Sequence, residues 1–86
     1  MEKYRITYKR NVFKDYKKIS SEICKKIINK IDELSNLPYP VQSKPLKGKE
    51  YTHRLRVGDY RVLYSVNEQK NEILVIKIKH RREVYR

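Results

Sequence analysis

The sequence has few of the residues that build covalent or metal-bound frameworks. It has one cysteine, Cys24, so no intramolecular disulfide can form, and this favours a cytoplasmic protein. Glycine occurs only twice, too rarely for a glycine-rich loop that binds phosphate, and the spacings typical of metal ligands do not occur. We therefore expect neither a metal nor a cofactor.

Long apolar runs are also missing. No segment approaches the roughly 20 apolar residues that cross a bilayer. The first residues, MEKYR, lack the apolar segment of a signal peptide. We expect no membrane partner. The length fits a single small domain spanning residues 1–86.

Acidic residues are scarce relative to basic ones. Lysine and arginine number 22 against 10 aspartates and glutamates, a net charge of +12. Such an excess attracts polyanions, so messenger RNA, ribosomal RNA and acidic proteins all fit as partners. The alternative is a surface that is merely lysine-rich and soluble.

Apolar residues in the first half alternate and then change period. Alternation over 3–9 predicts a strand, and Asn11 is a candidate cap for a short helix after it. Ser20 or Ser21 then begins a longer helix, with Glu22 in its first turn. The apolar stripe predicted for this second helix consists of Ile23, Cys24, Ile27, Ile28, Ile31 and Leu34.

The second half has the pattern of strands. The prolines in 37–40 end the helix, and 41–50 is predicted to be a polar connection. Strands are predicted at 52–57, 60–66 and 72–79, the last with Leu74, Ile76 and Ile78 on its apolar face. The predicted fold is α+β: an N-terminal strand, a two-helix hairpin, then three antiparallel strands forming a small sheet with the helices on one face.

The turn Gly58-Asp59 sets the register of a hairpin that concentrates charge. Arg56 then faces Arg61, and both share a face with Arg54. Like charges across a strand pair are destabilising, and guanidinium groups suit phosphate, so the cluster suggests an anion ligand. The alternative is that an internal acid neutralises part of the cluster, with Arg56 as the first candidate. The possible acids are Asp59, Glu50 and Glu83.

The chain ends in a second basic group. His80, Arg81 and Arg82 follow the last strand, and His80 could act as an acid or base, although a lone histidine is more often a plain hydrogen-bonding residue. A site made of side-chain cations fits RNA cleavage better than DNA cleavage, because the RNA 2′-hydroxyl supplies the nucleophile.

The run HRLRVGDYRVLY at 53–64, the strand ILVIKIK and the ending HRREVYR resemble the RelE/ParE toxin superfamily over nearly the whole chain. The resemblance implies a RelE-like toxin of a type II toxin–antitoxin system. Such toxins are ribosome-dependent endoribonucleases (mRNA interferases) that inhibit translation. They cut messenger RNA in the ribosomal A site with the 2′-hydroxyl as nucleophile and without a metal.

The resemblance also assigns roles to residues. Arg61 matches the arginine that stabilises the transition state, and Arg81 the one that protonates the leaving group or neutralises the phosphate. Tyr85 matches a tyrosine that stacks on or orients the substrate, and Arg54 the second member of a basic pair. The first member falls at Thr52, a departure that leaves the general base open, with His80, Lys47 and Lys49 as candidates. The residues expected to bind RNA are Arg56, Lys44, Lys47, Lys49 and Arg82.

The resemblance implies a partner as well, a RelB-like antitoxin that wraps the toxin, with operator DNA bound only through the antitoxin. Two alternatives stay open: a ParE-like inhibitor of DNA gyrase on the same fold, and a non-catalytic basic RNA-binding module. The combination of Arg54, Arg61, Arg81 and Tyr85 favours the nuclease.

Overall fold

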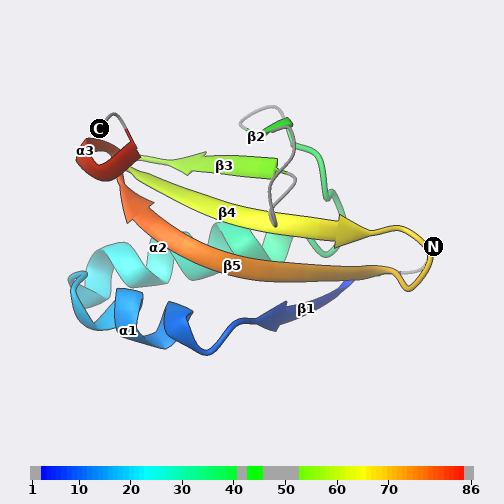
Figure 1. Ribbon diagram of the computed structural model, residues 1–86, viewed down its shortest axis with the longest axis horizontal. Helices are drawn as coiled ribbons and strands as arrows, with labels where there is room; N and C mark the ends of the chain where they lie inside the picture. Colours follow the sequence, from blue (N-terminus) through cyan, green and yellow to red (C-terminus); the bar gives the residue numbers. More distant parts are fainter. Residues whose placement is uncertain (1–2, 41–42, 46–52, 85–86) are drawn as a thin grey trace.

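The computed structural model describes residues 3–40, 43–45 and 53–84, and it has the predicted α+β architecture (Figure 1). One mixed sheet of five strands has the order β1-β5-β4-β3-β2, and α1 and α2 lie together against one face of it. The elements are β1 (Arg5–Tyr8), α1 (Asn11–Lys17), α2 (Ser21–Glu33), β2 (Ser43–Pro45), β3 (His53–Val57), β4 (Tyr60–Asn67), β5 (Glu72–His80) and α3 (Arg81–Val84).

The three C-terminal strands are antiparallel neighbours, as predicted, but two further strands extend the sheet. β1 pairs in parallel with β5, so the two ends of the chain meet inside one sheet. β2 lies within the segment 41–50 that we expected to be irregular, and it pairs antiparallel with β3. That expectation was wrong because three residues with a proline carry little strand pattern. Pro45 is tolerated because β2 is an edge strand.

The longer helix begins as predicted. Ser20 is its N-cap, and its Oγ accepts a hydrogen bond from the backbone N–H of Ile23 at 3.4 Å. Most of the predicted stripe faces the core, with Ile27, Ile31 and Leu34 fully buried. Ile28 is an exception, since 38% of it is exposed. The stripe is therefore narrower than the sequence pattern indicated.

The short helix α1 is joined to β5 by polar groups. Asn11 is not the N-cap, which is Arg10; its side-chain amide instead donates to the carbonyl of Ile76 at 2.8 Å. Asp15 is buried, and its Oδ2 accepts from the backbone N–H of Ile78 at 3.0 Å. Because β1 ends before this part of β5, side chains of α1 satisfy the backbone groups that β1 leaves unpaired.

The strand β5 is irregular in its middle. Leu63 pairs with Lys77 whereas Tyr64 pairs with Val75, so the register with β4 shifts at Ile76. A bulge of this kind reverses which residues face the core. The core-facing residues are Ile73, Val75 and Ile78, so the predicted apolar face was right for Ile78 and wrong for Leu74 and Ile76.

The hydrophobic core lies between the sheet and the two longer helices, and its side chains come from every part of the chain. Among the described residues, no helix is long and apolar enough to span a membrane. The core consists of Val12, Ile27, Ile31, Leu34, Leu55, Val62, Tyr64, Ile73, Val75 and Ile78. The opposite face of the sheet carries most of the charged side chains of the strands, together with Leu63 and Leu74.

Candidate nucleic-acid interface

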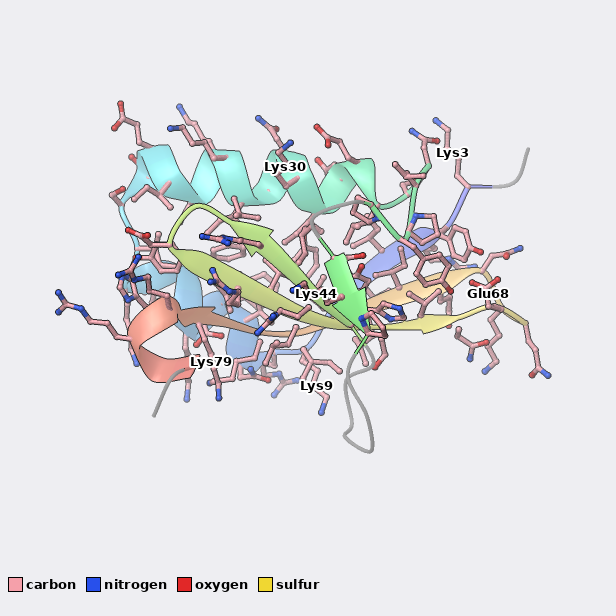
Figure 2. All side chains as sticks on the ribbon, turned by 90° about the horizontal axis from the view of Figure 1, so that it is seen from above. Lys3, Lys9, Lys30, Lys44, Glu68 and Lys79 are labelled. Carbon is pink, nitrogen blue, oxygen red and sulfur yellow. The ribbon has the colours of Figure 1, made fainter. Side chains whose placement is uncertain are left out.

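Cations gather on the face of the sheet that α1 and α2 do not cover. The strand register places Arg56, Arg61 and Lys79 in one row across β3, β4 and β5. The next row runs from Lys44 to Arg54, through Leu63, and ends at Lys77. We call this surface the basic face, and it consists of Lys44, Arg54, Arg56, Arg61, Lys77 and Lys79. In Figure 2, Lys44 and Lys79 lie over the strands, with Lys30 of α2 at the opposite margin of the molecule.

Arg61 is the most unusual member of the basic face, because only 4% of it is exposed. Its Nη1 donates to the carbonyl of Tyr60 at 3.2 Å and, at 3.5 Å, to that of Gly58. Among the carboxylates whose side chains the structure describes, none forms an ion pair with Arg61. Burying a cation costs free energy, part of which an incoming anion would recover.

The hairpin register is the predicted one, with Arg56 opposite Arg61 and Arg54 opposite Leu63. Of the acids named as possible partners of Arg56, Asp59 is the one whose side chain the structure describes, and it does not pair with Arg56. The carboxylate of Asp59 instead lies 3.6 Å from Nη1 of Arg81, with both side chains more than half exposed. The helix α3 begins at this point, so the pairing is a consequence of where β5 ends.

Arg61 and Arg81 both donate hydrogen bonds to backbone carbonyls of the same turn. The backbone N–H of Arg81 donates to the carbonyl of Asp59 at 2.7 Å, between the two carbonyls that accept from Arg61. The turn at Gly58 and Asp59 therefore holds two arginines that are twenty positions apart in the sequence. In Figure 1, α3 stands at the end of β5 beside this hairpin.

Two lysines of the basic face were missed by our reasoning from sequence. Lys77 lies 3.7 Å from the carboxylate of Asp15, and Lys79 lies directly across from Arg61. The signal was present, since lysines alternate with isoleucines in the run IKIK. The two lysines could not be placed beside Arg61 and Leu63, because the sequence does not fix the register of β5 against β4.

His80 lies near the basic face but on the other side of the sheet. It pairs with Tyr60, which faces the helices, and the two rings meet edge to face at 5.1 Å. Its Nδ1 accepts from the backbone N–H of Arg82 at 3.2 Å. His80 also lines a hollow of about 570 Å³ with Asp59, Arg81 and Arg82.

The remaining predicted residues divide into two groups. Lys44 is exposed and lies beside Arg54, and Arg82 is exposed on α3. Lys47, Lys49 and Tyr85 lie outside the described residues, as does Thr52. The structure therefore brings together Arg54, Arg56, Arg61, Lys44 and, at the shared turn, Arg81.

Comparison with known proteins shows what kind of protein carries this face. Residues 6–85 match the family of the ParE toxin of the type II toxin–antitoxin system parDE. The chain belongs to the RelE/ParE family of type II toxins. This toxin is 31% identical, over 98% of its length and 97% of the relative's, to the protein named "Putative toxin RelE1" of Methanocaldococcus jannaschii.

Solved structures of the family share the fold of this toxin. A chain of the archaeal RelE–RelB complex from Pyrococcus horikoshii has a TM-score of 0.82 and 30% identity, over 92% of this chain and 96% of that one. The isolated RelE toxin of E. coli has a TM-score of 0.75 at 23% identity, over 95% and 90% of the two chains, which supports the fold alone.

Proposed function

We propose that this toxin is a ribosome-dependent messenger RNA endoribonuclease that uses the RNA 2′-hydroxyl as nucleophile and fixed side-chain cations in place of a metal ion. The observation that carries the proposal is the row of Arg56, Arg61 and Lys79 on the open face, with Arg61 buried. Phosphate is the anion best matched to guanidinium groups, through paired hydrogen bonds.

The chemistry needs three contributions from the protein. The 2′-hydroxyl must be aligned, the charge on the phosphorane-like transition state must be stabilised, and the leaving 5′-oxygen must be protonated. Arg61 suits the second task, because its hydrogen bonds to the carbonyls of Gly58 and Tyr60 hold the guanidinium in place. A cation fixed before the reaction stabilises developing charge without reorganising.

Arg81 suits the third task, in which negative charge develops on the leaving 5′-oxygen and must be neutralised or protonated. Its pair with Asp59 is solvent-exposed and 3.6 Å long, so it contributes little and can be exchanged for a phosphate. Arg54 in the neighbouring row would hold an adjoining phosphate. Tyr85, which lies outside the described residues, is proposed to orient the substrate on the strength of the family resemblance alone.

We also propose a RelB-like antitoxin as the partner of this toxin. The related archaeal protein from Pyrococcus horikoshii was crystallised as a RelE–RelB complex. An antitoxin with acidic segments would suit the net charge of +12, and contact with operator DNA would then occur through the antitoxin.

Inhibition of DNA gyrase is the competing function, since the matched family is described by its ParE members. The basic face favours the nuclease, because a protein inhibitor has no need to bury a guanidinium beside other cations. The test is a translation extract in which messenger RNA ends are mapped by primer extension, with a gyrase supercoiling assay in parallel. Cuts within translated codons that vanish in R61A support the nuclease. Inhibited supercoiling with intact messenger RNA contradicts it, and so does the absence of both effects.

A further inference from the structure

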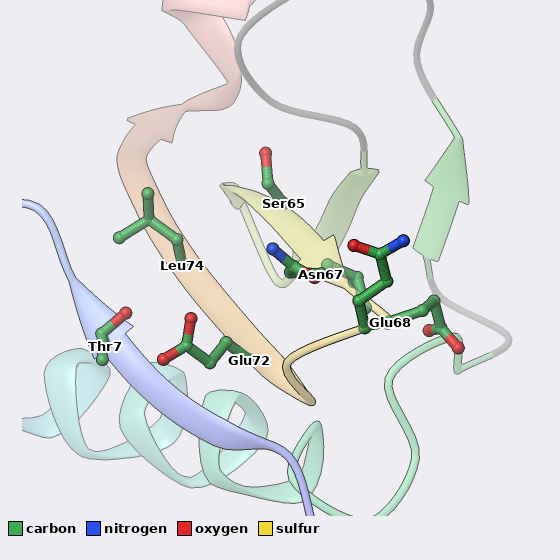
Figure 3. Close-up of a pocket in the computed structure, with 8 residues that line it drawn as sticks. Thr7, Ser65, Asn67, Glu68, Glu72 and Leu74 are labelled. Carbon is green, nitrogen blue, oxygen red and sulfur yellow. The ribbon is translucent and has the colours of Figure 1, made fainter.

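A second recess lies on the open face of the sheet, beyond the basic face and toward the β4–β5 turn. It measures about 550 Å³, within the range of small-ligand sites. Figure 3 shows side chains from three strands around it: Thr7 from β1, Glu72 and Leu74 from β5, and Ser65 and Asn67 from β4. We call this recess the turn pocket, and we define it by Thr7, Ser65, Asn67, Gln69, Glu72 and Leu74.

The turn pocket adjoins the basic face in the sheet. Ser65 is two residues from Leu63, the residue that lies between Arg54 and Lys77 in the second basic row. Residues two apart on one strand are about 7 Å apart on the same face. A ligand that contacts both surfaces would therefore place a phosphate on the basic face and a second chemical group, about 7 Å away, in the turn pocket.

The chemistry of the turn pocket differs from that of the basic face. Its floor is the apolar side chain of Leu74, which lies between Ser65 and Thr7 in the strand register. Its rim carries hydroxyl, amide and carboxylate groups, which can hydrogen-bond a flat polar ring lying on an apolar floor. A nucleobase has these properties.

The two carboxylates near the turn pocket, Glu72 and Glu68, already have an ion-pair partner or hydrogen-bond donors. Glu72 lies 3.7 Å from the guanidinium of Arg5. Glu68 accepts hydrogen bonds from the hydroxyls of Tyr4 at 2.9 Å and Tyr39 at 2.5 Å, which lower its pKa. With these acids occupied, the pocket does not require a cationic ligand, and a neutral base fits better than a lysine-rich protein segment.

We infer that the turn pocket is a nucleobase subsite, which binds the base of a nucleotide whose phosphate lies on the basic face. This inference rests on the proposed function and adds to it, because it places a neighbouring nucleotide of the RNA. The cations that attract phosphate lie on the basic face and not in the turn pocket, so the orientation of the nucleotide follows from the charges. Asn67 is held by the bond from the N–H of Lys70 to its Oδ1, so a base would meet the donor half of that amide.

The test is an NMR titration of the full chain with two probes, the RNA trinucleotide AAA and the ribose–phosphate trimer that lacks all three bases. We expect the trinucleotide to shift the signals of both the basic face and the turn pocket. The trimer should shift the basic face alone. Equal shifts in the pocket from both probes would overturn the inference, as would pocket shifts produced by a lysine tripeptide but not by the trinucleotide.

Variants sharpen the result. Thr7 and Gln69 are exposed, so T7A/Q69A should leave the fold intact, and we expect about tenfold weaker binding of the trinucleotide from the loss of two hydrogen bonds. Its affinity for the base-free trimer should not change, and N29A on the exposed side of α2 should change neither affinity. If T7A/Q69A binds both probes like the unaltered chain, the inference fails. The titration measures binding without cleavage. If the chain binds the base but does not cut messenger RNA, the proposed nuclease function is wrong and the nucleobase subsite still holds.

Discussion

Arg56 and Arg61 are direct partners across the β3–β4 hairpin, yet Arg56 is exposed whereas only 4% of Arg61 is exposed. Their charges are the same, so their surroundings separate their roles. The guanidinium of Arg61 is held against the hairpin by backbone carbonyls, while water screens that of Arg56. In the reaction we propose, the fixed and poorly screened Arg61 stabilises the transition state, and the exposed Arg56 mainly attracts the substrate.

We therefore predict different results for the two arginines when each is replaced by methionine. R61M should lower messenger RNA cleavage about a hundredfold or more, because a preorganised charge is lost. Its melting temperature should stay the same or rise, since a buried charge is replaced by an apolar side chain. R56M is the matched control and should reduce cleavage much less. Cleavage mapping and thermal unfolding check both variants, and equal losses of cleavage would contradict the distinction.

Asp15 is predicted to stabilise the part of the sheet that carries the basic face. In D15A the backbone N–H of Ile78 loses its acceptor, and we expect the free energy of unfolding to fall by about 1–3 kcal/mol. D15N keeps an acceptor oxygen and should lose less. D32A, at an exposed position of α2, should change stability little. Urea denaturation measures all three, and a D15A value equal to that of D32A would contradict the assignment.

We predict that Gly58 is needed for its backbone conformation, and not because a side chain at this position would clash with other atoms. Its φ is +58°, and a Cβ built on it meets no atom within 4 Å. G58A should therefore cost about 1–2 kcal/mol from the left-handed conformation alone. G58N should cost less, because asparagine tolerates that region. Denaturation curves test this ranking, and an alanine variant as stable as the unaltered chain would show that the turn changes conformation.

We predict that the free energy of unfolding depends on pH through His53. It lies between the rings of Tyr39 and Tyr64, and burial lowers its pKa from the ordinary value of 6.5. The unfolded chain therefore takes up a proton more readily than the folded one. The stability from neutral His53 is complete above pH 6.5 and is lost as the pH falls from 6.5 toward the lowered pKa.

The variant H53F retains an aromatic ring without a titrating group. We expect the difference in unfolding free energy between about pH 7.5 and about pH 5 to be smaller in H53F than in the unaltered chain. Urea denaturation at the two pH values gives both differences. An undiminished difference in H53F would show that other groups account for the pH dependence.

Reasoning from sequence identified the elements with strong local signals. The glycine at the hairpin turn fixed the pairing of β3 with β4 residue by residue, and Ser20 marked the start of α2. It failed where distant groups decide the outcome. Asn11 bonds β5 instead of capping α1, and β2 exists because β3 offers a free edge. The bulge at Ile76 interrupts the alternation of β5, so a strictly alternating pattern could not reveal it.

The candidate site was likewise predicted correctly where local sequence determines it, and not where distant elements do. Arg54, Arg56 and Arg61 share one face because a hairpin register is local information. The burial of Arg61 and the pairing of Arg81 with Asp59 depend on where β5 and α3 end, so they could not be read from the sequence. Lys79 was missed because its face depends on the register of β5.

The central claim is that fixed cations, and not a metal ion, break RNA through its own 2′-hydroxyl. The chemistry of the RNA ends tests this most directly, on programmed ribosomes that carry a normal messenger or one with a single 2′-deoxy nucleotide at the cut position. We predict a 5′-hydroxyl and a 2′,3′-cyclic phosphate from the normal messenger and no cut in the 2′-deoxy messenger. A 5′-phosphate product, or cutting that persists in the 2′-deoxy messenger, would contradict the account.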